Sequence, residues 1–194
     1  MVTNKKRQAI LQTAHRLFWK YGFKRVSIEE ICESAIVSKV TFYKFFANKI
    51  ELAKAVFDEV VDEGRQKFRR ITAESVTSEE WISKILLLKM EGTNDVSEEF
   101  LQDFYGNPDL GLKTYVEEKT ASEWNNMLQE LRLAQEKGFL RKNLNVEFFY
   151  LLAQKTGETL TDNKFLRLFS TPQQLVMELA NFFAYGMSPQ GQGK

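Results

Sequence analysis

Residues 37–52, which read VSKVTFYKFFANKIEL, gather hydroxyl groups, ammonium groups and aromatic rings just before a long amphipathic stretch. Five of these side chains can donate hydrogen bonds or bring charge to phosphate oxygens: Ser38, Lys39, Thr41, Tyr43 and Lys44. For any one of them, a solvated helix face or a helix cap explains the residue type equally well. The cluster as a whole favours a surface that positions a phosphate backbone.

The charge of the chain is distributed unevenly, although its formal net charge is only +1. Residues 1–50 hold ten Lys or Arg against three Asp or Glu, a net charge of +7. Residues 51–194 hold 17 Lys or Arg against 23 Asp or Glu, a net charge of −6. This asymmetry predicts that the first part of the chain meets a polyanion and that the acidic remainder has another role.

Composition places the 194-residue chain among ordinary soluble proteins, with 43% hydrophobic and 27% charged residues. No apolar run approaches the roughly 18 to 20 residues of a membrane span, and the basic N-terminus lacks the apolar segment of a secretory signal. We therefore expect a cytoplasmic protein with no membrane partner. With one cysteine, Cys32, and one histidine, His15, the sequence predicts no disulfide framework, no metal site and no cofactor. Cys32 is expected to be a buried structural thiol.

Apolar spacing predicts four helices in the first part of the chain, at about residues 4–21, 28–34, 39–45 and 49–70. Gly22 ends the first helix, and Ser27 with Glu30 forms a capping box for the second. Ser38 is the expected N-cap of the third helix, and Asn48 that of the fourth. Two short helices joined by a turn, with exposed donors on the second, are typical of a helix-turn-helix.

The later sequence predicts further helices and no strand, hence an all-α fold. After Ile71 a loop is expected to end in an N-cap at Thr77 or Ser78. The helices that follow are expected at about residues 79–90, around Phe100 to Phe104, and at 112–137, 146–161 and 172–185.

Four neighbouring residues extend the helix-turn-helix prediction. Lys49 begins the fourth helix, where its ammonium group and free amides can hold a second phosphate. Phe42 and Phe46, four residues apart, are expected to pack on the first helix. Phe45 fits a core position and a contact with a DNA sugar equally well.

The order and spacing from ILQTAHRLFWKYGFKRVSIEEICESA through VSKVTFYKFFANKIEL resemble the TetR-like (TetR/AcrR) family of bacterial transcriptional regulators, over residues 5 to about 60. The resemblance implies a three-helix DNA-binding domain followed by a helical domain for ligand binding and dimerisation. It also implies that Ser27 caps the second helix and touches a phosphate, and that Lys39, Thr41, Tyr43 and Lys49 line the DNA face. On this basis we divide the chain into a helix-turn-helix domain (1–48), a connecting helix (49–70), a ligand-binding and dimerisation domain (71–187) and a disordered tail (188–194).

Three positions depart from the family pattern. Ile36 and Val40 stand where the family commonly has Gly, and Phe45 where it has His. A β-branched residue with positive φ is strained, so we expect Ile36 to keep a negative φ. Val40 and Phe45 are expected to alter base reading, because apolar side chains can contact thymine methyl groups.

Large apolar residues in the acidic part suggest two further surfaces. A pocket for an apolar or aromatic effector is predicted from the rings and the thioether of Trp81, Phe104, Tyr105, Trp124 and Met127. A dimer seam on the last two helices is predicted from Phe148, Leu151, Leu152, Leu175, Leu179, Phe182 and Phe183. The competing explanations are a packed core for the first set and burial within one subunit for the second.

These observations predict a homodimeric DNA-binding transcriptional regulator, a repressor that a small effector of unknown identity releases from its double-stranded operator. An enzyme is the first rival, and the sequence offers it no Cys/His or Ser/His arrangement and no Gly-rich phosphate loop. Carboxylate chemistry alone stays open. A helical adaptor whose basic end binds protein is the second rival.

Overall fold

The computed structural model describes residues 2–189, with side chains from Lys5 onward, and every regular element in that range is helical. This confirms the all-α prediction. Of the predicted tail, residues 190–194 lie outside the described residues. Compact packing divides the chain into a first unit, residues up to 62 with 95–118, and a second unit, residues 63–94 with those from 119 on.

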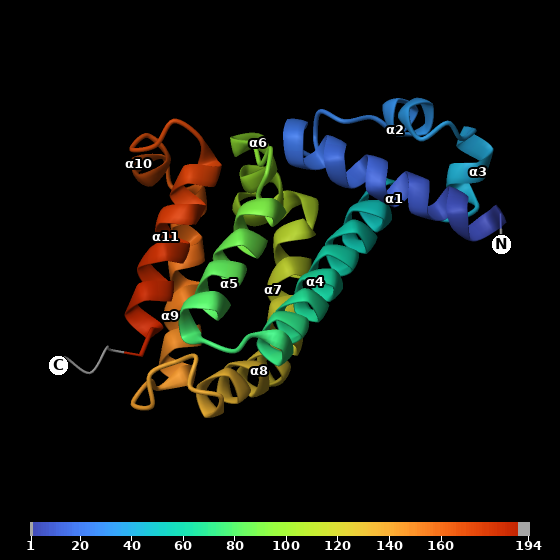
Figure 1. Ribbon diagram of the computed structural model, residues 1–194. Coiled ribbons are helices and arrows are strands. Elements are labelled where there is room, and N and C mark those ends of the chain that lie inside the picture. The colour runs from blue at the N-terminus through green and yellow to red at the C-terminus, as the bar shows by residue number, and fades with distance from the viewer. Residues whose placement is uncertain (1, 190–194) are drawn as a thin grey trace. The chain divides into compact units, whose positions relative to one another are not determined.

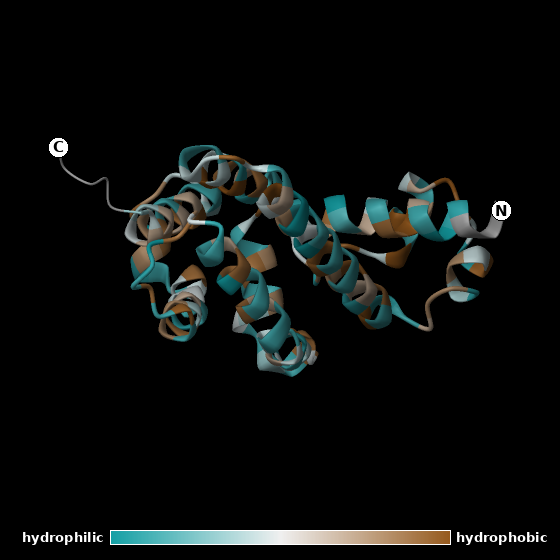
Figure 2. Ribbon diagram, turned by 60° about the horizontal axis from the view of Figure 1, so that its bottom comes forward, coloured by the Kyte–Doolittle hydropathy of each residue, from teal (hydrophilic) through white to brown (hydrophobic). Residues whose placement is uncertain are grey.

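None of the helices in the described part of the chain combines the length and apolar character that a bilayer crossing requires. Figure 2 shows hydrophilic and hydrophobic residues alternating along the helices, as expected for helices with one buried face.

Three helices at the start of the first unit pack on one another: α1 (Val2–Tyr21), α2 (Ile28–Ser34) and α3 (Lys39–Tyr43), drawn in blue in Figure 1. Their core contains the fully buried side chains of Ile10, Phe18, Ile31 and Phe42. The first helix ends before Gly22, as predicted. Gly22 itself has a φ of 77°. A Cβ atom on that glycine would lie 2.8 Å from the Cβ of Glu99, so both backbone angle and space require glycine there.

The remainder of the first unit comes from residues 95–118, which the sequence did not associate with the basic domain. It contains α6 (Glu98–Leu101), a π-helical turn η1 (Gln102–Gly106), a 3₁₀ turn η2 (Pro108–Leu110) and the start of α7 (Leu112–Ser122). The ring centroids of Trp19 and Phe100 lie 4.1 Å apart, and those of Phe100 and Phe104 lie 4.6 Å apart. Aromatic packing therefore joins this segment to α1.

Helix α4 spans Lys49–Glu74, so the predicted end of the connecting helix at residue 70 and the loop after Ile71 were wrong. Thr72 is fully buried, and its hydroxyl oxygen accepts a hydrogen bond from the indole Nε1 of Trp81 at 3.0 Å. The ammonium group of Lys137 donates to the carbonyl oxygens of Thr72 and Ala73 at 2.8 and 3.1 Å. These tertiary contacts satisfy the last turn, which its sequence alone would leave frayed.

The single helix predicted over residues 112–137 is two helices, α7 and α8 (Trp124–Glu136), with Glu123 between them at φ −87° and ψ 0°. The Ser122 hydroxyl donates to the carbonyl oxygen of Lys119 at 2.7 Å, a bond that competes with the helical ladder. The Glu123 carboxylate accepts hydrogen bonds from Arg65 at 2.9 Å and Asn126 at 2.8 Å. Side-chain hydrogen bonds therefore account for the break.

The second unit is a bundle in which α5 (Ser78–Gly92), α9 (Val146–Gly157) and α11 (Pro172–Met187) lie alongside one another, as Figure 1 shows. Thr77 caps α5, as predicted, and Pro172 lies in the first turn of α11. A 3₁₀ turn η3 (Glu158–Thr161) and a short α10 (Asn163–Leu166) connect α9 to α11. The core of the unit is built around Trp81, with Leu131, Ala134, Phe139, Leu140, Leu144, Val146 and Met187.

Candidate nucleic-acid interface

Helix α2 begins at the capping box that the sequence predicted. The Ser27 hydroxyl oxygen accepts a hydrogen bond from the Glu30 amide at 3.1 Å, and the Ser27 amide donates to the Glu30 carboxylate at 2.7 Å. Hydrogen bonds from the Ser27 backbone and hydroxyl lower the pKa of Glu30. The reciprocal bonds fix where α2 starts, and hence where the following turn and α3 fall.

The turn between α2 and α3 is a Schellman motif. The amide of Ile36 donates to the carbonyl oxygen of Glu33 at 3.1 Å, and the amide of Val37 donates to that of Cys32 at 2.9 Å. Ile36 takes a φ of 54°, so the expectation of a negative φ was wrong. The two hydrogen bonds require a left-handed residue at this position, and isoleucine adopts that conformation despite its branched Cβ.

The N-cap of helix α3 is Ser38, whose hydroxyl oxygen accepts a hydrogen bond from the Thr41 amide at 3.2 Å and lies 3.0 Å from the Thr41 hydroxyl. Tyr43 is 55% exposed, and its ring meets that of Phe42 edge-on at a centroid distance of 5.3 Å. Lys44 is exposed beside it. The structure therefore exposes four of the five predicted residues on and beside α3, Ser38, Lys39, Tyr43 and Lys44, whereas Thr41 is half-buried.

The ammonium group of Lys39 forms an ion pair with the carboxylate of Glu29, on the neighbouring helix α2. The hydrogen bond between them raises the pKa of Lys39 and lowers that of Glu29. Both side chains are solvent-exposed, so water screens the pair and its net contribution to stability is small. A phosphate can therefore replace Glu29 as the partner of Lys39 at little cost.

The rings of Phe42 and Phe46 are buried on the inner side of the motif, as the sequence predicted. Phe42 and Phe46 are buried, with ring centroids 5.8 Å apart, and the guanidinium of Arg7 on α1 lies 5.5 Å from the Phe46 centroid. Phe45 is half-buried. Cys32 is buried on α2, and burial raises the pKa of its thiol. These side chains anchor α2 and α3 to α1.

Lys49 differs from the other predicted phosphate contacts. Its ammonium group donates to the carbonyl oxygens of Phe23 at 2.8 Å and Val26 at 2.7 Å, and lies 4.3 Å from the Phe23 ring centroid. Burial lowers its pKa. The group is thus engaged with the backbone of the α1–α2 loop rather than directed to an external anion.

Residues 10–56 match the family described as bacterial regulatory proteins, tetR family, a span that covers most of α1 and the whole helix-turn-helix. Residues 10–56 therefore form a helix-turn-helix domain of the TetR family.

This chain also resembles helix-turn-helix transcriptional regulators in sequence. It is 27% identical over 108 residues to the HTH-type transcriptional regulator YhgD of Bacillus subtilis, an alignment that covers 55% of each chain, so the match spans about half of that relative. It is 36% identical over 56 residues to the HTH-type transcriptional repressor ComR of Escherichia coli, covering 29% of this chain and 27% of that one.

A solved structure extends the likeness of fold to nearly the whole chain. The fatty acid degradation regulator FadR of Bacillus halodurans matches with a TM-score of 0.67 at 18% identity, over 93% of this chain and 95% of that one. At this identity the similarity establishes the fold alone.

The residues predicted to line an effector pocket fall in both units of the TetR-type fold. Phe104 is buried in the aromatic cluster of the first unit, to which the adjacent Tyr105 also belongs. Trp81 is buried in the second unit, and Met127 packs against the same core. The rings of Trp124 and Tyr150 lie 4.8 Å apart. Trp81 and Phe104 are thus part of the packed core, which was the alternative explanation to an effector pocket.

A groove of about 170 Å³ opens between α4 and α5 of the second unit, and none of the predicted pocket residues lines it. Its walls include the basic residues Lys67, Arg70 and Lys84 and the apolar Leu87. The sequence could not predict this groove, because its lining residues belong to two different helices and the apolar spacing within each helix does not show how the two helices pack.

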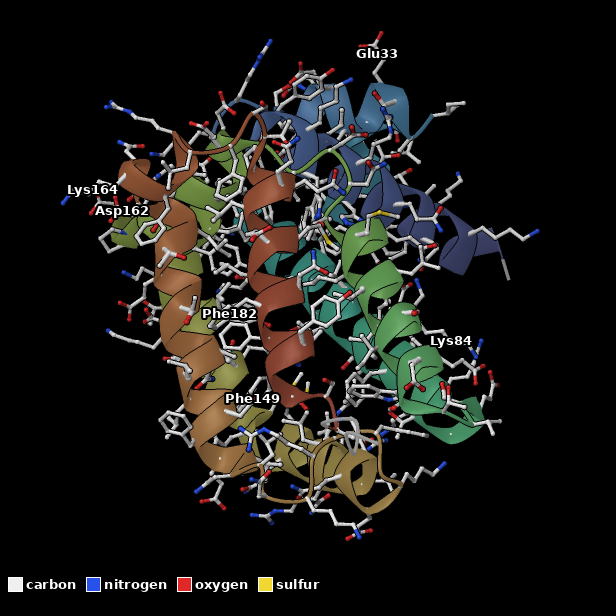
Figure 3. The ribbon with its side chains drawn as sticks, turned by 60° about the vertical axis from the view of Figure 1, so that its left-hand side comes forward. Glu33, Lys84, Phe149, Asp162, Lys164 and Phe182 are labelled. Atoms are coloured by element: carbon white, nitrogen blue, oxygen red, sulfur yellow. The ribbon has the colours of Figure 1, made fainter. Side chains whose placement is uncertain are left out.

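The predicted dimer residues lie on α9 and α11, which run side by side in Figure 3. Phe149 and Phe183 join the two helices, with ring centroids 5.4 Å apart. Large apolar side chains remain exposed on these helices: Phe148, Leu151, Leu152, Phe182 and Tyr185. Leu175 is only 2% exposed, because it packs inside its own unit, and Leu179 and Phe183 are half-buried.

Proposed function

We propose that this chain is a homodimeric, one-component transcriptional repressor that a small apolar or aromatic effector releases from its operator. The observation that carries the proposal is the α2–turn–α3 unit, whose caps fix a short helix with exposed hydroxyl and ammonium groups in a basic domain. We assign it no catalytic role, in keeping with its relatives, which are regulators.

We assign the contacts with DNA phosphates to Ser38, Lys39, Thr41, Tyr43 and Lys44. The positive end of the α3 dipole and the free amides of its first turn add attraction for a phosphate. The Ser27 hydroxyl lies at the start of α2 and is assigned a phosphate in the same way. Lys49 is assigned a supporting role, because its ammonium group already binds the carbonyl oxygens of the α1–α2 loop.

Dimerisation is assigned to the exposed apolar side chains of α9 and α11. Phe182 is 71% exposed and Phe148 is 63% exposed, which is costly for rings of this size in water. A second copy of the same two helices would cover them in a symmetric four-helix seam. Such a dimer presents two α3 helices to successive major grooves, about 34–36 Å apart.

The effector is assigned to the second unit because large rings and polar groups occur together there. Trp124 and Tyr150 contact each other near the Arg65–Glu123 ion pair, which mixes apolar area with hydrogen-bonding groups. An effector releases the operator only if it binds better to a dimer geometry that no longer matches the DNA. The sign of regulation is proposed by analogy with ComR, which is a repressor.

A mobility-shift assay with the DNA immediately upstream of the gene tests the proposal. We expect a specific complex that competitor DNA of random sequence does not displace, and that a compound from a hydrophobic library dissociates. Absence of any complex, with this DNA or with random duplex at low salt, would refute DNA binding. A specific complex that no library compound weakens would refute only the effector.

A further inference from the structure

Two apolar side chains on the helix-turn-helix are exposed without any partner in the described structure to account for them. Ile36 is 91% exposed and Val40 is 69% exposed. Ile36 also has a φ of 54°, a conformation that a β-branched residue rarely adopts. Since almost none of its side chain is buried, packing within the domain does not offset that strain.

The two side chains belong to the part of the motif that faces away from the core. Ile36 lies two residues before the N-cap Ser38, and Val40 lies two residues after it. The buried side chain of α3 is Phe42, which packs toward α1, so Ile36 and Val40 are left on the solvent side. Exposed Tyr43 is the last residue of α3, and exposed Lys44 is its C-cap.

Hydroxyl and ammonium groups accompany these two apolar residues along the chain, because Ser38 and Lys39 lie between them and Tyr43 and Lys44 follow. The hydroxyl and ammonium groups can bind phosphates. The branched alkyl groups of Ile36 and Val40 require an apolar group on the DNA, located between the two phosphate backbones. In the major groove of DNA that group is the C5 methyl of thymine, which distinguishes thymine from every other base. Contact with a methyl group would remove the exposed alkyl surface from water.

We propose that Ile36 and Val40 contact thymine methyl groups in the major groove and thereby set part of the operator sequence. The inference rests on the proposed DNA-binding function and adds the base that each half-site must contain. Glycine at these two positions would leave the methyl groups uncontacted.

The test begins with selection of bound sequences from a random duplex library by the wild-type protein. Each thymine of the selected half-site is then replaced by deoxyuridine, which removes only the methyl group. We expect one or two of these replacements to weaken wild-type binding about four-fold each, the factor that corresponds to burying one methyl group. Deoxyuridine at positions outside the half-site is expected to have no effect.

Ile36→Gly and Val40→Ala are the matching protein variants. Neither is expected to impair folding, because glycine suits the left-handed angle and alanine suits a helix. Each variant should bind the thymine operator more weakly and should no longer distinguish thymine from deoxyuridine at one position. Val76→Ala changes an 84% exposed valine in the loop before α5 and should retain the full discrimination.

The outcomes separate this inference from the proposed function. A selected operator whose thymines can all be replaced without loss would overturn the methyl contacts and leave DNA binding intact. Variants that discriminate as strongly as the wild type would also overturn them. If no sequence is selected and no duplex is bound, the proposed function fails and the inference fails with it.

Discussion

The carboxylate of Asp103 accepts a hydrogen bond from the backbone amide of Lys24 at 2.8 Å, although the two residues are 79 positions apart. The Lys24 ammonium also lies 3.7 Å from the other carboxylate oxygen. Asp103 is buried in η1. At Ser97, the N-cap of α6, the amide and the hydroxyl both donate to the Trp19 carbonyl oxygen at 2.9 Å. Polar contacts thus fasten the α6–η1 segment to the end of α1.

Replacing Asp103 by Ala should destabilise the protein by about 1.5–3 kcal/mol. The variant loses the charged carboxylate that accepts the hydrogen bond of the Lys24 amide. Urea denaturation followed by circular dichroism measures the change. Asp109→Ala, at an exposed carboxylate of η2, serves as the control and should change stability by less than about 0.5 kcal/mol. Equal effects of the two substitutions would contradict the fastening role.

Ile36→Gly should raise the free energy of unfolding by about 1 kcal/mol. The substitution relieves the strain of a β-branched residue at φ 54°, and this gain exceeds the entropy that glycine adds to the unfolded chain. Thermal unfolding measures the effect as a higher Tm. Val76→Gly removes an equally exposed branched side chain that lacks a positive φ, and should lower the Tm. A lower Tm for Ile36→Gly would contradict the strained turn.

Tyr115 should titrate late in the folded protein. Burial, together with the hydrogen bond that its hydroxyl donates to Asp58 at 2.7 Å, raises the pKa of Tyr115 to about 12, against an ordinary value of 10. The unfolded chain loses this proton first, so the contribution to stability is complete below pH 10 and disappears as the pH rises toward 12.

Near-ultraviolet absorbance during alkaline titration measures this proton release. Tyr105, whose pKa burial also raises to about 12, should titrate in the same range. Tyr115→Phe should remove part of the late absorbance change and flatten the loss of stability above pH 10. An unchanged titration curve in that variant would contradict the assignment.

Phe182→Glu should convert the proposed dimer to a monomer. A carboxylate at the centre of an apolar seam is costly to desolvate, and the 71% exposure of Phe182 means that the monomer itself tolerates the change. Sedimentation over a concentration series measures the mass. Val76→Glu, another exposed apolar position, should leave the dimer intact. A wild-type chain that is monomeric at micromolar concentration would remove the dimer and the palindromic operator together.

Local signals in the sequence predicted the starts of the capped helices α2, α3 and α5, although the starts of α8 and α10 were missed. Ser27 and Ser38 cap the helices that they were expected to cap, and Thr77, one of the two expected candidates, caps α5. These caps are local, because a side-chain oxygen needs only the backbone amides two or three residues ahead. The prediction of helix ends was less accurate where residues distant in the sequence supply the stabilising contacts. The last turn of α4 depends on Lys137, and the break at Glu123 depends in part on Arg65.

The candidate site shows the same limit. The exposed donors of α3 could be predicted because their types and spacing are local. The engagement of Lys49 with the Phe23 and Val26 carbonyls could not, since it depends on how the α1–α2 loop returns to α4. The positive φ of Ile36 was missed because residue preference argued against it, whereas two backbone hydrogen bonds decided it.

The central claim is that α3 contacts a DNA backbone. The salt dependence of DNA binding by the wild type and three variants tests this claim. The measurement is the slope of log binding constant against log salt for the wild type and for Lys44→Ala, Lys49→Ala and Lys142→Ala. We expect a steep slope for the wild type and a slope smaller by about one in Lys44→Ala. The slopes of Lys49→Ala and of the control Lys142→Ala, an exposed lysine of the second unit, should equal that of the wild type. A slope that Lys44→Ala leaves unchanged, or that Lys142→Ala reduces equally, would contradict the account.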